Sequence, residues 1–109
     1  MKNLFVIIVD CLRADFAHAH YLGFYHGSLV FRNCWATAGA TVPGVHSILT
    51  GLLPSEHGGI SEDVYPACPT LLDMARELGY NTLAVTENPL TRWLGQYFPA
   101  YKPLGDGEF

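Results

Sequence analysis

Two polar residues stand where an α/β protein would place catalytic groups. Asp10 closes the apolar run Leu4–Val9, and Thr41 lies two residues before Pro43 at the start of a short apolar segment. A carboxylate at the carboxyl end of a buried strand is a natural ligand for a hard cation. A threonine hydroxyl is a weak nucleophile that a metal ion or a base must activate. The pair therefore predicts a nucleophile beside a Lewis acid.

Each of these two residues also has a purely structural interpretation. Asp10 could be a turn residue or the N-cap of a following helix, and Thr41 could cap the helix that starts near Pro43. The N-terminus of that helix favours an anion through its dipole, whether a substrate phosphate or a threonine alkoxide. The spacing of the residues leaves both interpretations open.

Other polar residues near these two offer weaker signals. His57 is either a phosphate or metal contact at the rim of the site or a surface loop histidine, and His46 is expected to be half-buried and to pack. Arg13 is a further candidate for a substrate or rim contact, although we expect it to pair with Asp15 or to brace Asp10. The histidines at positions 18 and 20 have a strand-like spacing that could bind a metal ion.

Composition limits the classes of protein to consider. The chain has 109 residues, of which 50% are hydrophobic and 15% charged, so we expect one globular domain. The net charge is −4 and the six Lys and Arg residues are scattered, which excludes the basic patch of a nucleic-acid binder. The three cysteines have no C-x-x-C spacing and indicate reduced thiols. The apolar run 4–9 is too short for a signal peptide or a membrane span, so a cytoplasmic location is expected.

The segments that would position the polar residues alternate between strands and helices. Continuous apolar or aromatic runs predict strands at 3–10, 28–37 and 80–87. Capping residues and periodicity predict a turn or short helix at 12–17, helices at 43–50 and 70–79, and helical turns at 88–98, with a loop at 58–69. This alternation predicts an α/β fold with a mainly parallel sheet. Three strands make a thin sheet, so more chain or a second copy should complete it.

Three motifs resemble the sulfatase branch of the alkaline phosphatase superfamily. The opening NLFVIIVDCLRAD is similar to the family's apolar strand followed by V-D-x-L-R-x-D. The stretch TVPGVHSILTGLLPSEHG resembles the nucleophile segment, and CPTLLDMARELGYNTLAV resembles the segment that follows it. The motifs occur in the family's order from Asn3 to about Val85, so the resemblance implies a partial, doubly wound α/β fold with flanking helices.

The resemblance assigns roles to individual residues. Asp10 matches the first metal-binding aspartate, and Thr41 stands at the catalytic nucleophile, which also ligates the metal. Ser47, Thr50 and Gly51 match the structural part of the motif. The implied cofactor is a divalent metal ion, one of Ca, Mg, Mn or Zn. The remaining ligands, an Asp and a His or Asn, come from far downstream in the family, so residues 1–109 are expected to be the N-terminal portion of a catalytic domain, with weak or no activity alone.

The departures from the family pattern favour phosphoryl chemistry. Sulfatases have a Cys or Ser at the nucleophile and oxidise it to formylglycine, which Thr41 cannot become. They also carry an arginine where this chain has Val45, and Cys11 replaces the second aspartate that some of them have. Threonine nucleophiles are typical of the phosphodiesterase, phosphotransferase and phosphonate-cleaving relatives. The resemblance therefore implies hydrolysis or transfer of a small phosphate ester through a covalent threonine intermediate. The scattered basic residues and the short apolar run lead us to expect no nucleic-acid or membrane partner.

Two alternatives remain at this point. The first is a sulfuric ester hydrolase with a non-standard nucleophile, acting on a small sulfate ester. The second is a non-catalytic α/β module, or a decayed fragment, that binds an anion or a partner through the helix at Pro43.

Overall fold

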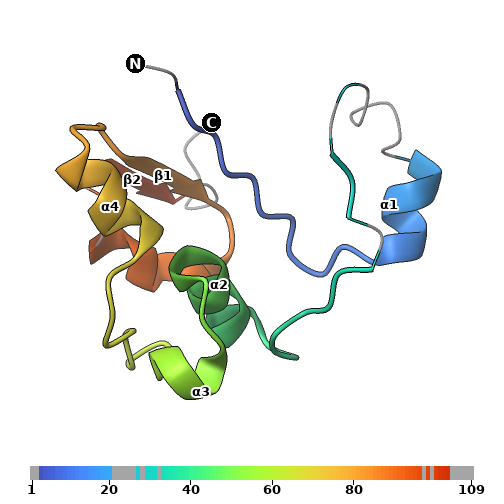
Figure 1. Cartoon of the computed structure of the whole chain (residues 1–109), viewed down its shortest axis with the longest axis horizontal. Coiled ribbons are helices and arrows are strands. Elements are labelled where there is room, and N and C mark those ends of the chain that lie inside the picture. Colours follow the sequence, from blue (N-terminus) through green and yellow to red (C-terminus); the bar gives the residue numbers. More distant parts are fainter. Residues whose placement is uncertain are drawn as a thin grey trace. The chain divides into compact units, whose positions relative to one another are not determined.

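The computed structural model describes residues 3–20, 27, 29–31, 33–96, 98 and 100–103 of the chain. The chain divides into two compact units, Met1–Trp35 and Ala36–Phe109 (Figure 1). In the described part of the chain, no helix has the length and apolarity needed to cross a membrane.

The first unit contains one described helix, α1, which spans Ala14–His20. The predicted helix at 12–17 therefore exists but is displaced toward the C-terminus. The predicted strands at 3–10 and 28–37 are wrong for the described residues, because positions 3–9, 29–31 and 33–37 form no strand. Side chains expected in a core are exposed, with Ile7 at 85%. A strand needs a neighbour to take up its backbone N–H and C=O groups, and the described part of this unit supplies none.

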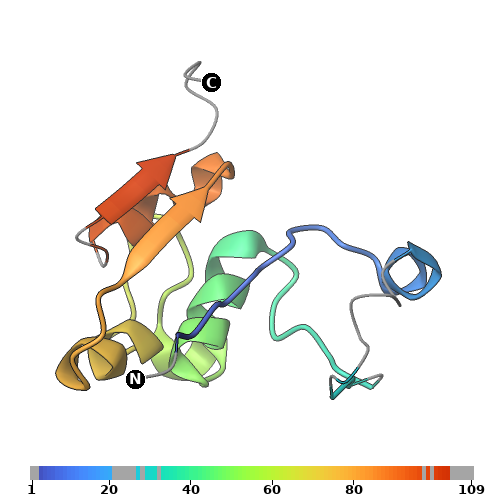
Figure 2. The ribbon, with the colours of Figure 1, turned by 90° about the horizontal axis from the view of Figure 1, so that it is seen from above.

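The second unit holds the other elements. They are the helices α2 (Thr41–Thr50), α3 (Pro54–His57) and α4 (Leu71–Glu77), the strand β1 (Leu83–Thr86), the 3-10 helix η2 (Pro89–Gln96) and the strand β2 (Ala100–Pro103). The strands lie side by side in parallel, with Leu83 opposite Ala100 and Thr86 opposite Pro103 (Figure 2). The crossover between them is η2, which lies against both strands and against α2.

The core of this unit joins α2, α4 and η2. Its buried members are Val45 and Leu49 from α2, Leu72 from α4 and Trp93 from η2, and Leu94 and Phe98 pack against them. Val42, Val45 and Leu49 recur at the helical spacing i, i+3, i+7, which puts one face of α2 against the core. This face fixes α2, the helix that begins with Thr41.

The predicted helices of this unit are largely confirmed. The helix expected at 43–50 begins two residues earlier, and it ends at Gly51, whose φ of 72° is left-handed as a helix exit requires. The helix expected at 70–79 is α4, and the helical turns expected at 88–98 are η2. Positions 58–69 contain no helix or strand, as predicted.

The predicted sheet is only partly present. One predicted strand, 80–87, corresponds to β1, and β2 was not predicted. The described residues hold one two-stranded sheet rather than a doubly wound one. The strand β1 was expected to be buried on both faces, yet Leu83 and Val85 are 63% and 53% exposed. A parallel strand is buried only when helices cover both faces of its sheet, and here one face is open.

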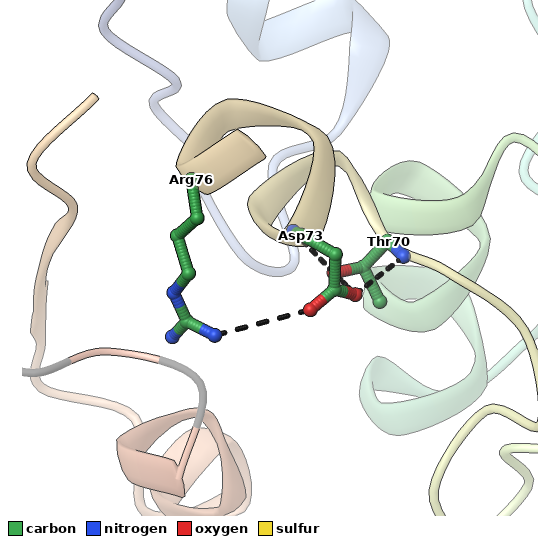
Figure 3. Close-up of polar contacts among 3 residues, drawn as sticks. All are labelled: Thr70, Asp73 and Arg76. Atoms are coloured by element: carbon green, nitrogen blue, oxygen red, sulfur yellow. Dashed lines mark hydrogen bonds and ion pairs between the residues drawn. The ribbon is translucent and has the colours of Figure 1, made fainter. Parts of the chain in front are cut away.

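The start of α4 is closed by its own side chains (Figure 3). The N-cap Thr70 accepts a hydrogen bond from the Asp73 backbone N–H, and Asp73 Oδ2 accepts from the Thr70 N–H and hydroxyl, each at 2.7 Å. This reciprocal capping box satisfies two backbone donors that a helix start leaves open. The hydroxyl and backbone N–H of Thr70 hold the pKa of Asp73 below its usual value.

Candidate active site

Thr41 is the first residue of α2. The N-cap position before it belongs to Ala40, whose backbone is extended and whose side chain makes no capping hydrogen bond. The interpretation of Thr41 as the N-cap is therefore wrong. Thr41 is half-buried and lies at the positive end of the helix dipole. Pro43, the third residue of α2, has no backbone N–H to donate.

The other end of α2 is closed by the residues that the resemblance assigns to structure. The Thr50 hydroxyl donates to the His46 carbonyl at 2.8 Å and accepts from the Leu52 N–H at 3.3 Å. The N–H of Gly51 donates to the Ser47 carbonyl at 2.8 Å. These bonds satisfy backbone groups that the end of a helix leaves open, so Thr50 and Gly51 terminate α2 at a fixed residue.

The two histidines of this segment are fully buried. The exposed fractions of His46 and His57 are both 0%. The burial of His57 contradicts the alternative that it is a surface loop histidine, whereas its predicted contact with a phosphate or metal stays a prediction. The chain turns at Gly58, with a φ of 72°, and folds His57 under α2 instead of outward. His46 packs as predicted, with its ring centroid 3.9 Å from that of Trp93.

The hydrogen bonds of His57 assign its tautomer. The Gly59 N–H donates to His57 Nδ1 at 3.0 Å, so the proton of the neutral ring is on Nε2. Nε2 lies 3.0 Å from Ser47 Oγ and donates to it. A neutral ring in this state cannot accept the Ser47 proton, so this pair is not a nucleophile with its general base. Ser47 is buried and acts as a structural acceptor.

The hydrogen bonds of His46 assign the opposite tautomer. Its Nδ1 lies 3.0 Å from the Gly59 carbonyl, which can only accept, so Nδ1 carries the proton. Nε2 has no hydrogen-bond partner among the described residues. Burial lowers the pKa of His46, and the neighbouring His57 lowers it further. The buried His46 ring is therefore neutral at pH 7.

Asp10 lies in the first unit, at an exposed turn. Its Oδ1 accepts the Cys11 N–H at 3.1 Å, and Cys11 has a φ of 56°, which is uncommon for a residue other than glycine. The neighbouring Arg13 donates to Asp15 through Nε at 3.0 Å and Nη2 at 2.7 Å. The predicted Arg13–Asp15 pair is thus confirmed, and this hydrogen bond lowers the pKa of Asp15.

The described residues do not complete a metal site. No group of three or more His, Cys, Asp or Glu side chains among them could hold an ion. Asp10 and Thr41, the two ligands that the resemblance implies, belong to different units, the first and the second. A divalent ion with oxygen ligands needs more donors than these two. The prediction that His18 and His20 could bind a metal ion assumed the side-chain spacing of a strand, but both residues lie in the helix α1.

A comparison with protein-family models places the chain in a family. The Sulfatase family model matches residues 2–100, so this chain belongs to the Sulfatase family. Members of this family are hydrolases that act on sulfate esters, and they usually bind a divalent metal ion. The family has the α/β fold of the alkaline phosphatases. Comparisons with curated proteins and with solved structures gave no match.

Two contributors to the site region were not foreseen in the sequence. Gly59 bonds both histidines through one N–H and one carbonyl, and Trp93 supplies the surface on which His46 packs. The adjacent glycines at 58 and 59 signal a turn in the sequence. No local pattern connects Trp93 with α2, because the contact depends on how the chain folds back.

Proposed function

We propose that this chain is the N-terminal part of a metal-dependent hydrolase or transferase of small phosphate esters, with Thr41 as its nucleophile. The observation that carries the proposal is the place of Thr41 at the first position of α2. Its helix is anchored by a buried face, while its N-cap residue provides no side-chain oxygen to the first turn. A helix start of this kind favours a phosphate group close to the threonine hydroxyl.

The surroundings of Val45 support phosphate over sulfate esters. This is the position at which the sulfatase pattern has an arginine, and here it is 5% exposed and belongs to the core with Leu49, Leu72 and Trp93. A guanidinium at that position would be buried without a partner, which is costly. At these two motif positions the chain has Thr41 in place of the Cys or Ser that can become formylglycine, and Val45 in place of the arginine.

The proposed reaction forms and breaks one phosphorus–oxygen bond in each step. Thr41 Oγ gives up its proton and attacks the phosphorus, the bond to the leaving alkoxide breaks, and the alkoxide takes up a proton and leaves as the alcohol. Water or an acceptor alcohol then attacks the phosphothreonine and restores the hydroxyl. Backbone N–H groups at the start of α2 stabilise charge on the phosphoryl oxygens.

We include a divalent metal ion in the proposal, with Asp10 as one ligand, because the family usually binds one. When bound, such an ion supplies Lewis-acid chemistry and lowers the pKa of a coordinated hydroxyl. The other ligands would come from further chain. An intact mass of the native gene product well above 12.0 kDa would support this, and a mass of 12.0 kDa would contradict it.

The nucleophile is tested with the native gene product on matched aryl phosphate and aryl sulfate esters. We expect faster turnover of the phosphate ester and a covalent adduct of one phosphoryl group on the peptide containing Thr41. Thr41→Ala should abolish the adduct and lower kcat by on the order of a thousandfold or more. Thr41→Ser should keep part of the activity, since it retains the hydroxyl.

Thr37→Ala is the matched control, since Thr37 is exposed and precedes the helix. It should leave both rates unchanged. Full activity in Thr41→Ala would refute the nucleophile. Preferential turnover of the sulfate ester would instead favour the sulfuric ester hydrolase.

A further inference from the structure

The peptide group of Gly59 is held between two buried histidines. Its carbonyl accepts from His46 Nδ1, and its N–H donates to His57 Nδ1, each at 3.0 Å. Gly59 is itself buried, and a Cβ at this position would lie 2.6 Å from His46 Nδ1. The arrangement therefore requires a glycine, and it ties the segment after α3 to α2.

The two bonds need opposite protonation at Nδ1: His57 Nδ1 must be unprotonated to accept from the Gly59 N–H, whereas His46 Nδ1 must carry a proton to donate to the Gly59 carbonyl. A second proton on His46 would have to sit on Nε2, which is buried and has no acceptor among the described residues. A second proton on His57 would have to sit on Nδ1, where it would face the Gly59 N–H, another donor. The two rings also lie close together, with centroids 5.7 Å apart, so two positive charges would repel each other.

We propose that His46, His57 and Gly59 form a proton-sensitive clamp, which holds the segment after α3 on α2 while both rings are neutral and releases it when His46 takes up a proton. The proton comes from solvent and goes to His46 Nε2. The charged ring then leaves its buried position for water, and its bond to the Gly59 carbonyl is lost. This device goes beyond the proposed function and does not depend on it.

The charged side chains on the elements around the clamp are exposed or bonded elsewhere, so His57 is the titratable group that acts on His46. Glu56 on α3 is exposed and its carboxylate accepts the Leu53 N–H, while Arg92 on η2 is exposed. On α4, Asp73 bonds Thr70 and faces Arg76. No carboxylate among these is positioned to stabilise a charged His46, and the face of Trp93 offers only partial compensation.

The direction of the pH effect follows from the buried position of His46. Its pKa in the folded chain is below the ordinary value of 6.5, so the unfolded chain binds more protons between these two values. The contribution of the clamp to stability is therefore complete above pH 6.5 and is lost as the pH falls toward the folded pKa. Asp73 and Asp15 also have lowered pKa values, so they titrate at more acidic pH.

Trp93 reports on the clamp, because it is 7% exposed and its ring lies against His46. Trp35→Phe removes the other tryptophan, which is 91% exposed, and leaves Trp93 as the only tryptophan, which is excited selectively over the tyrosines at long wavelength. In this single-tryptophan chain we expect a reversible shift of the emission to longer wavelength as the pH is lowered from about 7.5 to about 4.5. Emission that stays constant over this range would overturn the proposal.

His46→Asn tests which group titrates. An asparagine amide can replace the Nδ1–H donor to the Gly59 carbonyl but cannot take up the proton. The shift should be lost or reduced severalfold in this variant, and it should be unchanged in His18→Asn, which alters a histidine of α1. A shift of the same size in His46→Asn would overturn the proposal.

The unaltered chain provides a second measurement that does not depend on the folding of a variant. Nitrogen-15 NMR of the imidazole rings at pH 7.5 should show a protonated Nδ1 on His46 and a protonated Nε2 on His57. The reverse tautomer on His46, or a charged ring at this pH, would refute the clamp. Loss of phosphate-ester activity in Thr41→Ala has no bearing on this result, so the two proposals fail separately.

Discussion

Two helices of the second unit begin in opposite ways. The first turn of α4 is closed by Thr70 and Asp73, which satisfy its backbone donors reciprocally. The first turn of α2 follows Ala40, which has no oxygen to offer. A helix start that is capped by its own chain is part of the scaffold, whereas one without a side-chain cap is able to bind an anion. By this difference, α4 is a structural helix, and the start of α2 is the candidate anion site in the same unit.

The two helices are nevertheless held by the same core. Leu49 of α2 and Leu72 of α4 meet around Trp93, so neither helix is fixed independently of the other. The capped helix therefore supports the uncapped one. Three substitutions test this comparison, in order of decreasing expected effect.

Leu49→Ala should cause the largest loss of stability, because it leaves a cavity between the two helices. We expect a loss of about 2–5 kcal/mol in the free energy of unfolding, measured by urea denaturation. Ile48→Ala is the matched control at the preceding residue, which is 54% exposed. It should change the free energy by no more than about 0.5 kcal/mol. Equal losses in both variants would show that α2 has no buried face.

Thr70→Ala should cause an intermediate loss, because it removes the side chain that caps α4. We expect a loss of about 1–2 kcal/mol in the free energy of unfolding. The folded pKa of Asp73 lies below its ordinary value of 3.8, so its contribution to stability is complete above that value and is lost as the pH falls through the folded pKa. The variant should therefore lose less stability than the parent on acidification below about pH 4.

Arg76→Ala is the control for this prediction. Its Nη1 lies 3.8 Å from Asp73 Oδ1, and both side chains are 38% exposed. An exposed ion pair of this length should contribute no more than about 0.5 kcal/mol. A loss in Arg76→Ala that matches that in Thr70→Ala would mean that the ion pair, and not the cap, stabilises α4.

Ala40→Asp would make the start of α2 resemble that of α4. The new carboxylate can accept the Val42 N–H and interact with the helix dipole, so we expect a gain of about 0.5–1 kcal/mol in stability. Activity on a phosphate ester should fall in the same variant, because the carboxylate competes with the substrate for the first turn. Ala36→Asp adds the same charge at an exposed position outside the helix and should change neither quantity. Greater stability with full activity would contradict a phosphate site at this helix start.

Elements with local signals could be predicted from the sequence. The helix α4 has a capping threonine, apolar residues on one face and a glycine exit, and Gly79 has the expected left-handed φ of 79°. The exit of α2 at Gly51 was predicted for the same reason. The strand expected at 3–10 failed, because an apolar run forms a strand only beside a partner that the sequence does not identify.

The site was predictable to a lesser extent. Motif spacing identified Thr41 and Asp10 as candidates, and nothing local could show that His57 is buried beneath α2. That burial depends on the turn at Gly58, which brings His57 against Ser47 and His46 of α2. The described residues contain no group of three or more metal-ligating side chains, so the metal site expected from the motifs stays a prediction.

The position of Trp93 in the chain sets the order in which the second unit can be built during synthesis. The buried face of α2 is complete only when η2, which is synthesised after α2, α4 and β1, supplies Trp93. Until then, Val45 and Leu49 lack part of their covering, and a short helix without tertiary packing is marginal in water. The helix that begins with Thr41 therefore becomes fixed late, when the chain has been extended at least through η2.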